Sequence, residues 1–543
     1  MADLVLHGGV VFDGEKVLPG ATAVAVRDGR VLAVGSDDEV RAAVGDATEV
    51  VDLAGRLVLP GFTDAHVHPV QGGVERLGCD LTGATGAADT LDRVRRFADA
   101  HPELDWIVGG GWLKEYFAAG LPTAAALDQA VPDRPVMLRD NSHHAVWVNS
   151  EALRRAGVAP SQLPDPGHVG TLHEEEMDLV AAHVPDETLD EQVAGLLEAQ
   201  RYLHGLGVTG WQDAIVGAYA GHPDPTAAYL AVAARGLLTA RVTGALWFPR
   251  GTTAERLPDV VADLVRRRSD VAAAVPDGRF RAGTVKVMQD GVVESRTAGL
   301  VEPYVELPGC ACEPRSGLSY VDPQVLRDAA VLLSRNGFQL HVHAIGDRAV
   351  RESLDALEAA LADPDAVPDL RHHVAHLQVV DPVDVPRFAA LGVTANCQAL
   401  WACHEAAMDD LNIPILGPVR SSWQYPFASL VRTGAALAMG SDWPVSTPDP
   451  LAAIEVAVTR REPGGDRPAL LPDEALDVVT ALSAYTLGSA RVTHRDDGGR
   501  VAAGALADLV VLDRDVTAVP PDEISGVQVD LTLVDGRLVW ERS

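Results

Sequence analysis

The chain has 543 residues, and its 77 acidic and 44 basic side chains give a net charge of −33. Because nucleic acids and anionic membranes bind basic surfaces, this charge argues against both as partners. Apolar residues make up 47% of the chain and charged residues 22%, which is typical of a globular protein and excludes a disordered or fibrous one.

The cysteine content and the absence of long apolar runs indicate the compartment. Five cysteines in a chain of this length cannot form a disulfide framework, so we expect a reducing compartment. The first residues lack the basic and apolar segments of a signal peptide, and no apolar run approaches about 18 residues, the length of a membrane span. We therefore expect a cytoplasmic protein with no membrane partner.

The two ends of the chain share a β-rich pattern. Short apolar runs near each end turn at Asp-Gly pairs, at 28–29 and at 535–536, which is a strong hairpin signal. Short hairpins cannot bury their apolar faces alone. We therefore expect residues 1–57 and 497–543 to form one small composite β-sandwich.

The segment between these ends, 58–496, alternates short apolar strands with helical stretches. Eight such strands predict an α/β fold, a (β/α)8 TIM barrel with its functional residues at the C-terminal strand ends. The segment 76–200, between the first two strands, is too long for a loop and contains strand-like runs of its own. It is expected to be an inserted subdomain over the barrel mouth. The eight strands are expected at 58–65, 208–213, 241–247, 283–288, 339–343, 374–377, 393–397 and 436–442.

Polar side chains stand at the ends of four of these strands. His66 and His68 are two residues apart on a strand, so their imidazoles share a face. His343, His376 and Asp442 end the fifth, sixth and eighth strands. Four imidazoles and one carboxylate at one rim are the ligand set of zinc or a similar divalent ion. The alternative is a polar cluster in the core, which is costly without partners.

Lys286 lies on the fourth strand among apolar residues. Only three of the basic residues are lysines (Lys16, Lys114 and Lys286), as if arginine had replaced lysine wherever it could serve. An ammonium has no lone pair and would repel a dication. A Lys286 carboxylated on its side-chain nitrogen would instead be an anion that can bridge two metal ions. The alternative is a buried ammonium neutralised by an acid such as Asp290.

These residues, together with further motifs, carry a resemblance that covers essentially the whole chain. The sequence resembles the amidohydrolase superfamily and, within it, amidohydrolase family 3, the YtcJ-like branch that includes N-substituted formamide deformylases. One departure is the stretch 289–294, where a small, Gly- and Ser-rich sequence is expected. The motifs are Leu-Pro-Gly-Phe-Thr-Asp-Ala at 59–65, Gly-Gly-Trp at 110–112, Ser-His-His-Ala-Val-Trp-Val-Asn-Ser at 142–150, Ser-Arg-Thr-Ala at 295–298, His-Ala-Ile-Gly-Asp-Arg-Ala at 343–349 and Gly-Ser-Asp-Trp-Pro-Val at 440–445.

Further residues are assigned less specific roles. His144 and Arg296 are candidate catalytic or substrate-binding groups, with structural roles as the alternative. An aromatic substrate pocket is expected from four tryptophans, with the hydrophobic core as the alternative. Asp347 is expected to cap a helix. The tryptophans are Trp112, Trp147, Trp401 and Trp443; His341, His372 and His373 are expected to be structural, and Cys310 and Cys312 to be free thiols.

The resemblance and the ligand set together predict a metal-dependent hydrolase. It would hydrolyse a non-peptide C–N bond of a small, apolar or aryl-substituted amide, with zinc or another divalent metal, one or two ions, activating water. Asp442 would accept the proton of that water. The alternatives are an esterase, lactonase or isomerase acting at the same site, and a non-catalytic assembly protein. The expected partner is a small-molecule substrate, and a homodimer is left open.

Overall fold

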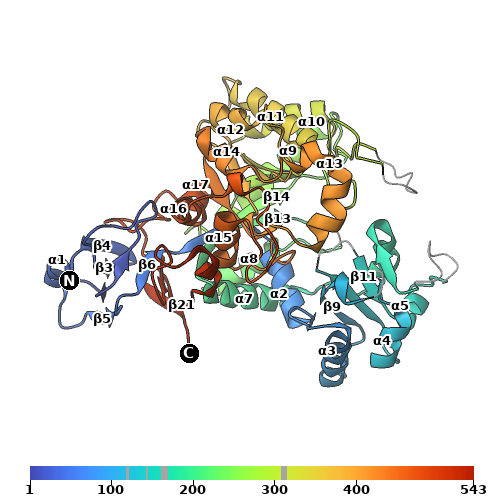
Figure 1. The fold of residues 1–543 in the computed structure, drawn as a ribbon, viewed down its shortest axis with the longest axis horizontal. Helices are drawn as coiled ribbons and strands as arrows, with labels where there is room; N and C mark the ends of the chain where they lie inside the picture. Colours follow the sequence, from blue (N-terminus) through green and yellow to red (C-terminus); the bar gives the residue numbers. More distant parts are fainter. Residues whose placement is uncertain (118–120, 142–144, 160–168, 220, 307–314) are drawn as a thin grey trace.

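The computed structural model describes residues 1–117, 121–141, 145–159, 169–219, 221–306 and 315–543 (Figure 1). Its centre is a sheet of eight parallel strands in the order β19-β18-β17-β16-β15-β14-β13-β7. The two outer strands meet where the Asp442 backbone N–H donates to the His66 carbonyl at 2.7 Å. This sheet confirms the predicted (β/α)8 barrel. The strands are β7 (Phe62–Val67), β13 (Val208–Val216), β14 (Arg241–Trp247), β15 (Phe280–Met288), β16 (Gln339–Ala344), β17 (His373–His376), β18 (Thr394–Cys397) and β19 (Leu437–Met439).

The strand predicted over 58–65 is wrong as a single element. The structure has two strands there, β6 (Leu57–Pro60) and β7, which separate at Gly61. β6 pairs antiparallel with β20 (Leu509–Leu512) in the terminal sheet, whereas β7 belongs to the barrel. A Cβ atom at Gly61 would lie 2.3 Å from the Thr209 side chain, so only glycine fits where the chain passes from one sheet to the other.

Helices cover the outside of the barrel. In α10 the Asp322 carboxylate accepts from the Gln324 and Val325 backbone N–H groups, Pro323 occupies the first turn, and the apolar face packs inward. The barrel helices are α2 (Pro69–Leu77), α7 (Leu189–Gly205), α8 (Thr226–Ala234), α9 (Leu257–Ala274), α10 (Pro323–Arg335), α11 (Asp347–Leu361), α12 (Val385–Leu391), α13 (Ile413–Ser421), α14 (Phe427–Arg432), α15 (Pro450–Thr459), α16 (Val478–Ser483) and α17 (Ser489–Val492). The short turns among them are η6 (Ala399–Trp401), η7 (Met408–Asn412), η8 (Pro472–Glu474) and η9 (Ala484–Gly488).

Two small sheets form a sandwich from both ends of the chain. One has the order β4-β3-β1-β5 and the other β2-β6-β20-β21-β22. Leu4, Val24, Val58 and Val511, which come from both ends of the sequence, are buried in one core between them. The remaining elements are β1 (Leu4–His7), β2 (Val10–Val11), β3 (Ala23–Arg27), β4 (Arg30–Gly35), α1 (Asp37–Val40), η1 (Arg41–Ala43), β5 (Glu49–Asp52), η10 (Pro521–Gly526), β21 (Val529–Val534) and β22 (Arg537–Glu541).

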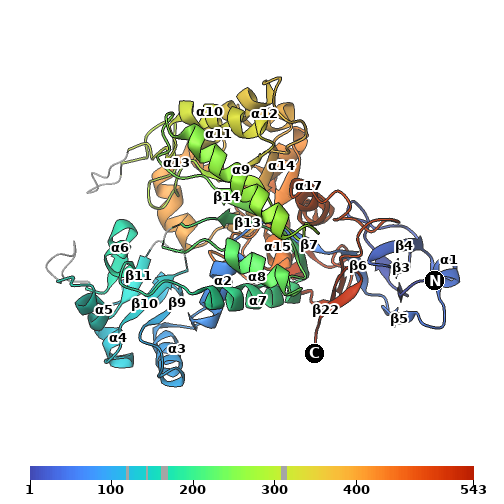
Figure 2. The same cartoon turned by 180° about the vertical axis from the view of Figure 1, so that it is seen from behind.

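The segment between α2 and α7 is a separate layer with a five-stranded sheet in the order β12-β11-β10-β9-β8. It leaves the barrel at the C-terminal end of β7 and lies on the side away from the terminal sandwich (Figures 1 and 2). No helix in the described ranges is both long and apolar enough to span a bilayer. The elements of the layer are β8 (Cys79–Asp80), α3 (Ala87–Ala100), β9 (Ile107–Trp112), η2 (Lys114–Tyr116), α4 (Ala124–Ala130), β10 (Val136–Asp140), β11 (Ala145–Val148), α5 (Ser150–Arg155), β12 (Thr171–His173), η5 (Glu174–Met177) and α6 (Asp178–Ala181).

Candidate active site

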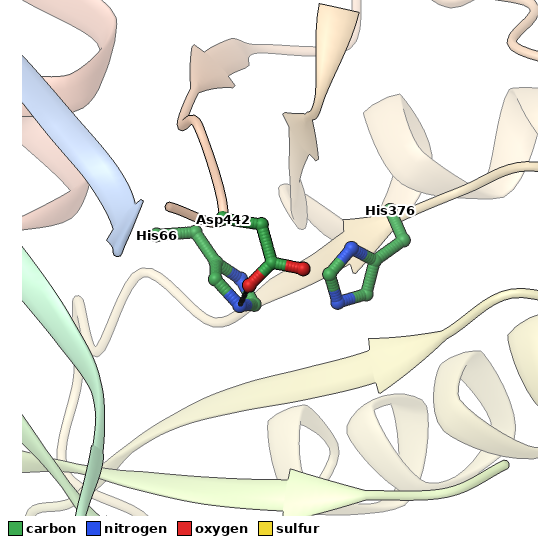
Figure 3. Close-up of side chains that lie close together, drawn as sticks. All are labelled: His66, His376 and Asp442. Carbon is green, nitrogen blue, oxygen red and sulfur yellow. Dashed lines mark ion pairs between the residues drawn. The ribbon is translucent and has the colours of Figure 1, made fainter. Parts of the chain in front are cut away.

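Three predicted ligands meet at the C-terminal ends of β7, β17 and β19. One donor atom from each of His66, His376 and Asp442 lies within 4.8 Å of the others, and all three side chains are buried. Figure 3 shows the two imidazoles on either side of the Asp442 carboxylate. The Nε2 atom of His66 is 3.1 Å from Oδ1 of Asp442. Strands that are far apart in sequence therefore bring two candidate nitrogen ligands and one candidate oxygen ligand together.

The other three predicted ligands adjoin this group. The Nε2 atom of His68 is 3.0 Å from Oδ1 of Asp442, and the Nζ atom of Lys286 is 3.4 Å from Nε2 of His66. The ring of His343 lies 4.3 Å from the ring of His376, centroid to centroid. The Nε2 atom of His343 is 3.2 Å from the Gly291 carbonyl oxygen. All six residues thus lie at one end of the barrel.

Burial controls the charge of these side chains. It lowers the pKa of His66 to about 3 and the pKa of Lys286 to about 7, and it lowers the pKa values of His343 and His376 well below the usual range. Burial would raise the pKa of Asp442, but the adjacent imidazoles outweigh it and hold that pKa well below its usual value. The group therefore offers neutral nitrogen donors and one anionic carboxylate at neutral pH.

His376 gives a direct test of whether a metal fits. Both of its ring nitrogens are buried, and neither has a hydrogen-bond partner in the described part of the chain. Buried polar atoms are almost always paired, so an unpaired imidazole beside the Asp442 carboxylate, with one nitrogen in the ligand group, matches a site for a cation. A divalent metal with nitrogen and oxygen ligands satisfies this chemistry.

The backbone is strained where it presents these ligands. His376 and Asp442 have φ values of +78° and +57°, in the left-handed region that residues other than glycine rarely adopt. The Gln398 side-chain oxygen holds the first turn by accepting from the His376 backbone N–H at 2.7 Å. Beside the second, a Cβ atom at Gly440 would lie 2.5 Å from the His66 backbone nitrogen, so the Gly-Ser-Asp motif needs its glycine.

Several supporting residues lie behind the ligands. The Nε2 atom of His341 is 2.9 Å from Nδ1 of His66, which fits the structural role predicted for His341. Asp64, which the sequence interpretation missed, accepts from the backbone N–H groups of His66 and Ser441, and burial raises its pKa to about 7. Asp64 therefore joins the first and last strands of the barrel. Its place two residues before His66, on the same strand, was the available signal.

Other predicted structural residues lie outside this group. His372 hydrogen-bonds to the Leu340 backbone N–H and to the Ser334 hydroxyl. His373 contacts Asn396. Asp347 does not cap α11 as predicted: Gly346 is the N-cap residue, and the Asp347 carboxylate accepts from the backbone N–H groups of Arg348 and of Val301 in a loop.

Two of the predicted pocket tryptophans belong to the core of the inserted layer. Trp112 and Trp147 are 0% exposed and pack against each other and against Leu138. Their indole N–H groups donate to the Leu138 and Thr123 carbonyls. The pocket role predicted for them is therefore corrected to a role in the core, where each indole has its hydrogen-bond partner.

The remaining candidates differ in their distance from the ligands. Trp401 stacks on the His376 ring at 5.5 Å between centroids, beside the site. Trp443 packs against Tyr202 of α7, in the main core. Arg296 is half-buried, with its guanidinium carbon 6.0 Å from the Tyr304 ring centre. His144, Cys310 and Cys312 lie outside the described residues.

A buried carboxylate anchors the loop after β15. Asp290 accepts from the backbone N–H groups of Ile345 at 3.0 Å and of Gly299 and Gly346 at 2.8 Å each, and burial raises its pKa to about 7. Its Oδ1 atom is 3.5 Å from Nε2 of His343. No ion pair joins Asp290 to Lys286 within the described ranges, so the suggested neutralisation of that lysine by Asp290 is not observed.

The sequence interpretation also missed a group of side chains at the ends of β13, β14 and β15. We call Tyr219, Trp247, Arg250, Met288 and Tyr320 the rim cluster. The rings of Tyr219 and Trp247 are 4.7 Å apart, and the guanidinium carbon of Arg250 lies 4.0 Å from the centre of the Tyr320 ring. The five residues come from four separate segments, so no spacing in the sequence indicates them.

Comparison with known proteins identifies the family. The sequence model of the amidohydrolase family matches residues 49–540 of this chain. The chain belongs to the amidohydrolase family. This amidohydrolase is 32% identical over 532 residues to the protein LONG AFTER FAR-RED 3 of Arabidopsis thaliana, covering 94% of this chain and 87% of that protein. It is 29% identical over 557 residues to the N-substituted formamide deformylase of Arthrobacter pascens, covering 96% and 95% respectively.

A solved structure agrees with this assignment. An uncharacterized metal-dependent hydrolase from Pyrococcus furiosus superimposes on this amidohydrolase with a TM-score of 0.72 at 26% sequence identity, over 94% of this chain and 99% of that one. The family and this neighbour indicate that the chain is a metal-dependent hydrolase.

Proposed function

We propose that this amidohydrolase hydrolyses a C–N bond, other than a peptide bond, in a small apolar or aryl-substituted amide. The proposal rests on one observation: His66, His376 and Asp442 lie together in a buried group, and neither ring nitrogen of His376 has a hydrogen-bond partner in the described part of the chain. The similarity to an N-substituted formamide deformylase supports the choice of bond.

The residues that would hold the metal are those already described. His66, His68, His343 and His376 would supply imidazole nitrogens, and Asp442 would supply a carboxylate. A divalent ion bound there would supply Lewis-acid polarisation of the scissile carbonyl and would acidify water.

Asp442 is the group placed to move protons. Its low pKa keeps it ionised at neutral pH, and its Oδ1 atom lies between His66 and His68. As the oxygen of water bonds to the carbonyl carbon, Asp442 accepts a proton. It then delivers that proton to the nitrogen as the C–N bond breaks, which yields an acid and an amine.

Lys286 would complete the ligand set after carboxylation. Its pKa of about 7 leaves a substantial share of neutral amine at neutral pH. That amine can attack carbon dioxide, forming an N–C bond and releasing one proton, and the product is an anion beside His66. A protein supplied with ¹³C-bicarbonate should show a carbamate carbon signal by NMR. The signal should be absent from Lys286→Met, and its absence from the wild type would refute carboxylation.

The test of the proposed function combines metal analysis with a substrate panel. N-aryl and N-alkyl formamides, acetamides, lactams and hydantoins are compared with matched esters and lactones. We expect bound zinc or another divalent ion and turnover of at least one C–N substrate. His68→Ala should lose metal and activity together, whereas His183→Ala, at an exposed histidine, should lose neither. Turnover of esters or lactones alone would favour the alternative hydrolase, and full activity without metal would refute the proposal.

A further inference from the structure

The rim cluster faces the same side of the barrel sheet as the candidate ligands. Trp247 is the last residue of β14, and its Cα partner on β15 is Lys286. Met288 is two residues beyond Lys286, and its Cα partner on β16 is His343. Paired residues of neighbouring parallel strands point to the same face, as do residues two apart on one strand. Trp247 and Met288 therefore lie on the ligand side, toward the C-terminal ends of the strands.

Arg250 is held in this cluster by aromatic rings and hydrogen bonds. Its guanidinium carbon lies 4.0 Å from the centre of the Tyr320 ring and 5.2 Å from that of Tyr219. Its Nη2 atom donates to the Tyr219 hydroxyl at 2.8 Å and contacts the Met288 sulfur. The backbone N–H of Tyr320 donates in turn to the Gln289 carbonyl at 2.8 Å, which fixes that ring beside the end of β15. These contacts position the arginine without supplying an anionic partner from the described residues.

The charge of Arg250 has no protein counterion within the ranges described. No aspartate or glutamate oxygen there lies within 4.0 Å of its guanidinium, although the chain carries 77 acidic residues. Arg267 of α9, by contrast, forms an ion pair with Asp224 at 2.5 Å. The hydrogen bonds that Arg250 makes to described side chains use Nη2, so among these residues the donors on Nε and Nη1 are left for a ligand.

We propose that Arg250 binds a carboxylate of the substrate, so that the substrates are aryl amides that also carry a carboxylate group. This inference rests on the proposed function and narrows its substrate class. A planar guanidinium matches a carboxylate with two parallel hydrogen bonds. The rings of Tyr219, Trp247 and Tyr320 offer apolar faces for the aryl part. One uncompensated cation matches one carboxylate, and the net charge of −33 opposes a polyanion.

The experiment compares two formamides that differ mainly in charge. N-(4-carboxybenzyl)formamide carries a carboxylate, and N-(4-nitrobenzyl)formamide carries a neutral group of the same shape. The 3-substituted pair is included because the spacing is part of the test. For at least one pair we expect kcat/KM of the metal-loaded wild-type enzyme to be about 10-fold higher for the carboxylate substrate. This ratio corresponds to the lower end of the free energy of a charged hydrogen bond, because Arg250 is exposed.

Two variants assign this preference to its residue. Arg250→Met removes the charge, and the ratio of the two kcat/KM values should fall to about one, mainly through KM for the carboxylate. Arg256→Met removes an exposed arginine outside the rim cluster, and the ratio should stay at the wild-type value. A ratio near one in the wild type, or an unchanged ratio in Arg250→Met, overturns the inference and leaves the proposed function standing if either formamide is cleaved.

A binding measurement keeps the inference testable if neither formamide is cleaved. Calorimetry with benzoate and with the neutral acetophenone, on metal-loaded protein, reports on Arg250 independently of turnover. We expect the Kd of benzoate to rise about 10-fold in Arg250→Met and the Kd of acetophenone to change little. An equal benzoate Kd in wild type and variant would show that the carboxylate binds elsewhere, for example on the metal, and would overturn the inference.

Discussion

Replacing Asp290 should release two loops beside the candidate ligands. Asp290 is 0% exposed, and its carboxylate accepts from the backbone N–H groups of Gly299, Ile345 and Gly346. In Asp290→Ala these three buried groups lose their acceptor. At about 1–2 kcal/mol for each unsatisfied group, the local stability should fall by about 3–6 kcal/mol.

Asp290→Asn should cost less, because of how the three bonds divide between the two oxygens. Gly299 and Gly346 donate to Oδ2, and Ile345 donates to Oδ1. An asparagine oriented with its oxygen at the Oδ2 position keeps two bonds and faces its NH₂ toward the Ile345 N–H. The loss of the Ile345 hydrogen bond, together with the repulsion between two N–H donors that face each other, should lower the local stability by about 1–3 kcal/mol.

Hydrogen–deuterium exchange measures this directly, because it reads the opening of the same backbone amides. Exchange at Gly299 and Gly346 should accelerate strongly in Asp290→Ala and much less in Asp290→Asn, whereas the exposed Asp410→Ala should change neither. Equal acceleration in the two Asp290 variants would show that the bonding pattern is not what stabilises the loops. Unchanged exchange in Asp290→Ala would refute the anchor altogether.

The remaining predictions concern the ligands, the inserted layer and the pH dependence of stability. Lys286→Arg should bind less metal and be inactive, because a guanidinium forms no comparable carbamate. Acetate should partly restore metal binding to Lys286→Ala. An active, metal-loaded Lys286→Arg enzyme would contradict carboxylation. Asp442→Asn should lower kcat by about 10²–10⁴-fold while metal content by atomic absorption falls less, and normal turnover would place the base elsewhere. Trp147→Phe should lower the free energy of unfolding by about 1–3 kcal/mol in thermal unfolding without changing KM, because this indole is in the core of the insertion. A changed KM would show that Trp147 contacts the substrate. Burial raises the pKa of Asp213 to about 6, so the folded protein holds its proton more tightly than the unfolded chain, and the stability of the metal-free protein should fall by about 2 kcal/mol as pH rises from about 4 to 6. Asp213→Asn should lack this decrease, and identical pH profiles would contradict it.

The grouping of the candidate ligands at one end of the barrel could be predicted from sequence because the barrel topology determines it. His66, His343, His376 and Asp442 are far apart in the chain, yet each ends an apolar strand, and the C-terminal ends of parallel barrel strands meet at one rim. A strand period of two explains why His68 joins His66. The terminal hairpins were predictable for a similar reason, since each end lacks a partner for its apolar face.

The sequence interpretation failed where one residue type suits two environments. An indole serves equally well in a core and beside a substrate, and Trp147 alternates with Val146 and Val148 in a strand that is buried on both sides. The Asp290 anchor was hidden for another reason. Its partners are backbone amides, which every residue except proline carries, so nothing in the identities at 299, 345 or 346 marks them.

The scarcity of lysine does not by itself single out Lys286. Lys114 also survives, and it makes a 3.0 Å ion pair with Asp140 that an arginine could equally make. What distinguishes Lys286 is its position: it is 2% exposed, and its Nζ atom is 3.4 Å from the nitrogen of a candidate ligand. An ammonium there would repel a metal ion, and a guanidinium would do so at every accessible pH. Only an amine that can lose its proton and then gain a carboxylate changes from an obstacle to metal binding into a ligand. For the carboxylation that we propose, the burial of Lys286 matters because it lowers the pKa of the amine to about 7, where a share of it is neutral at neutral pH.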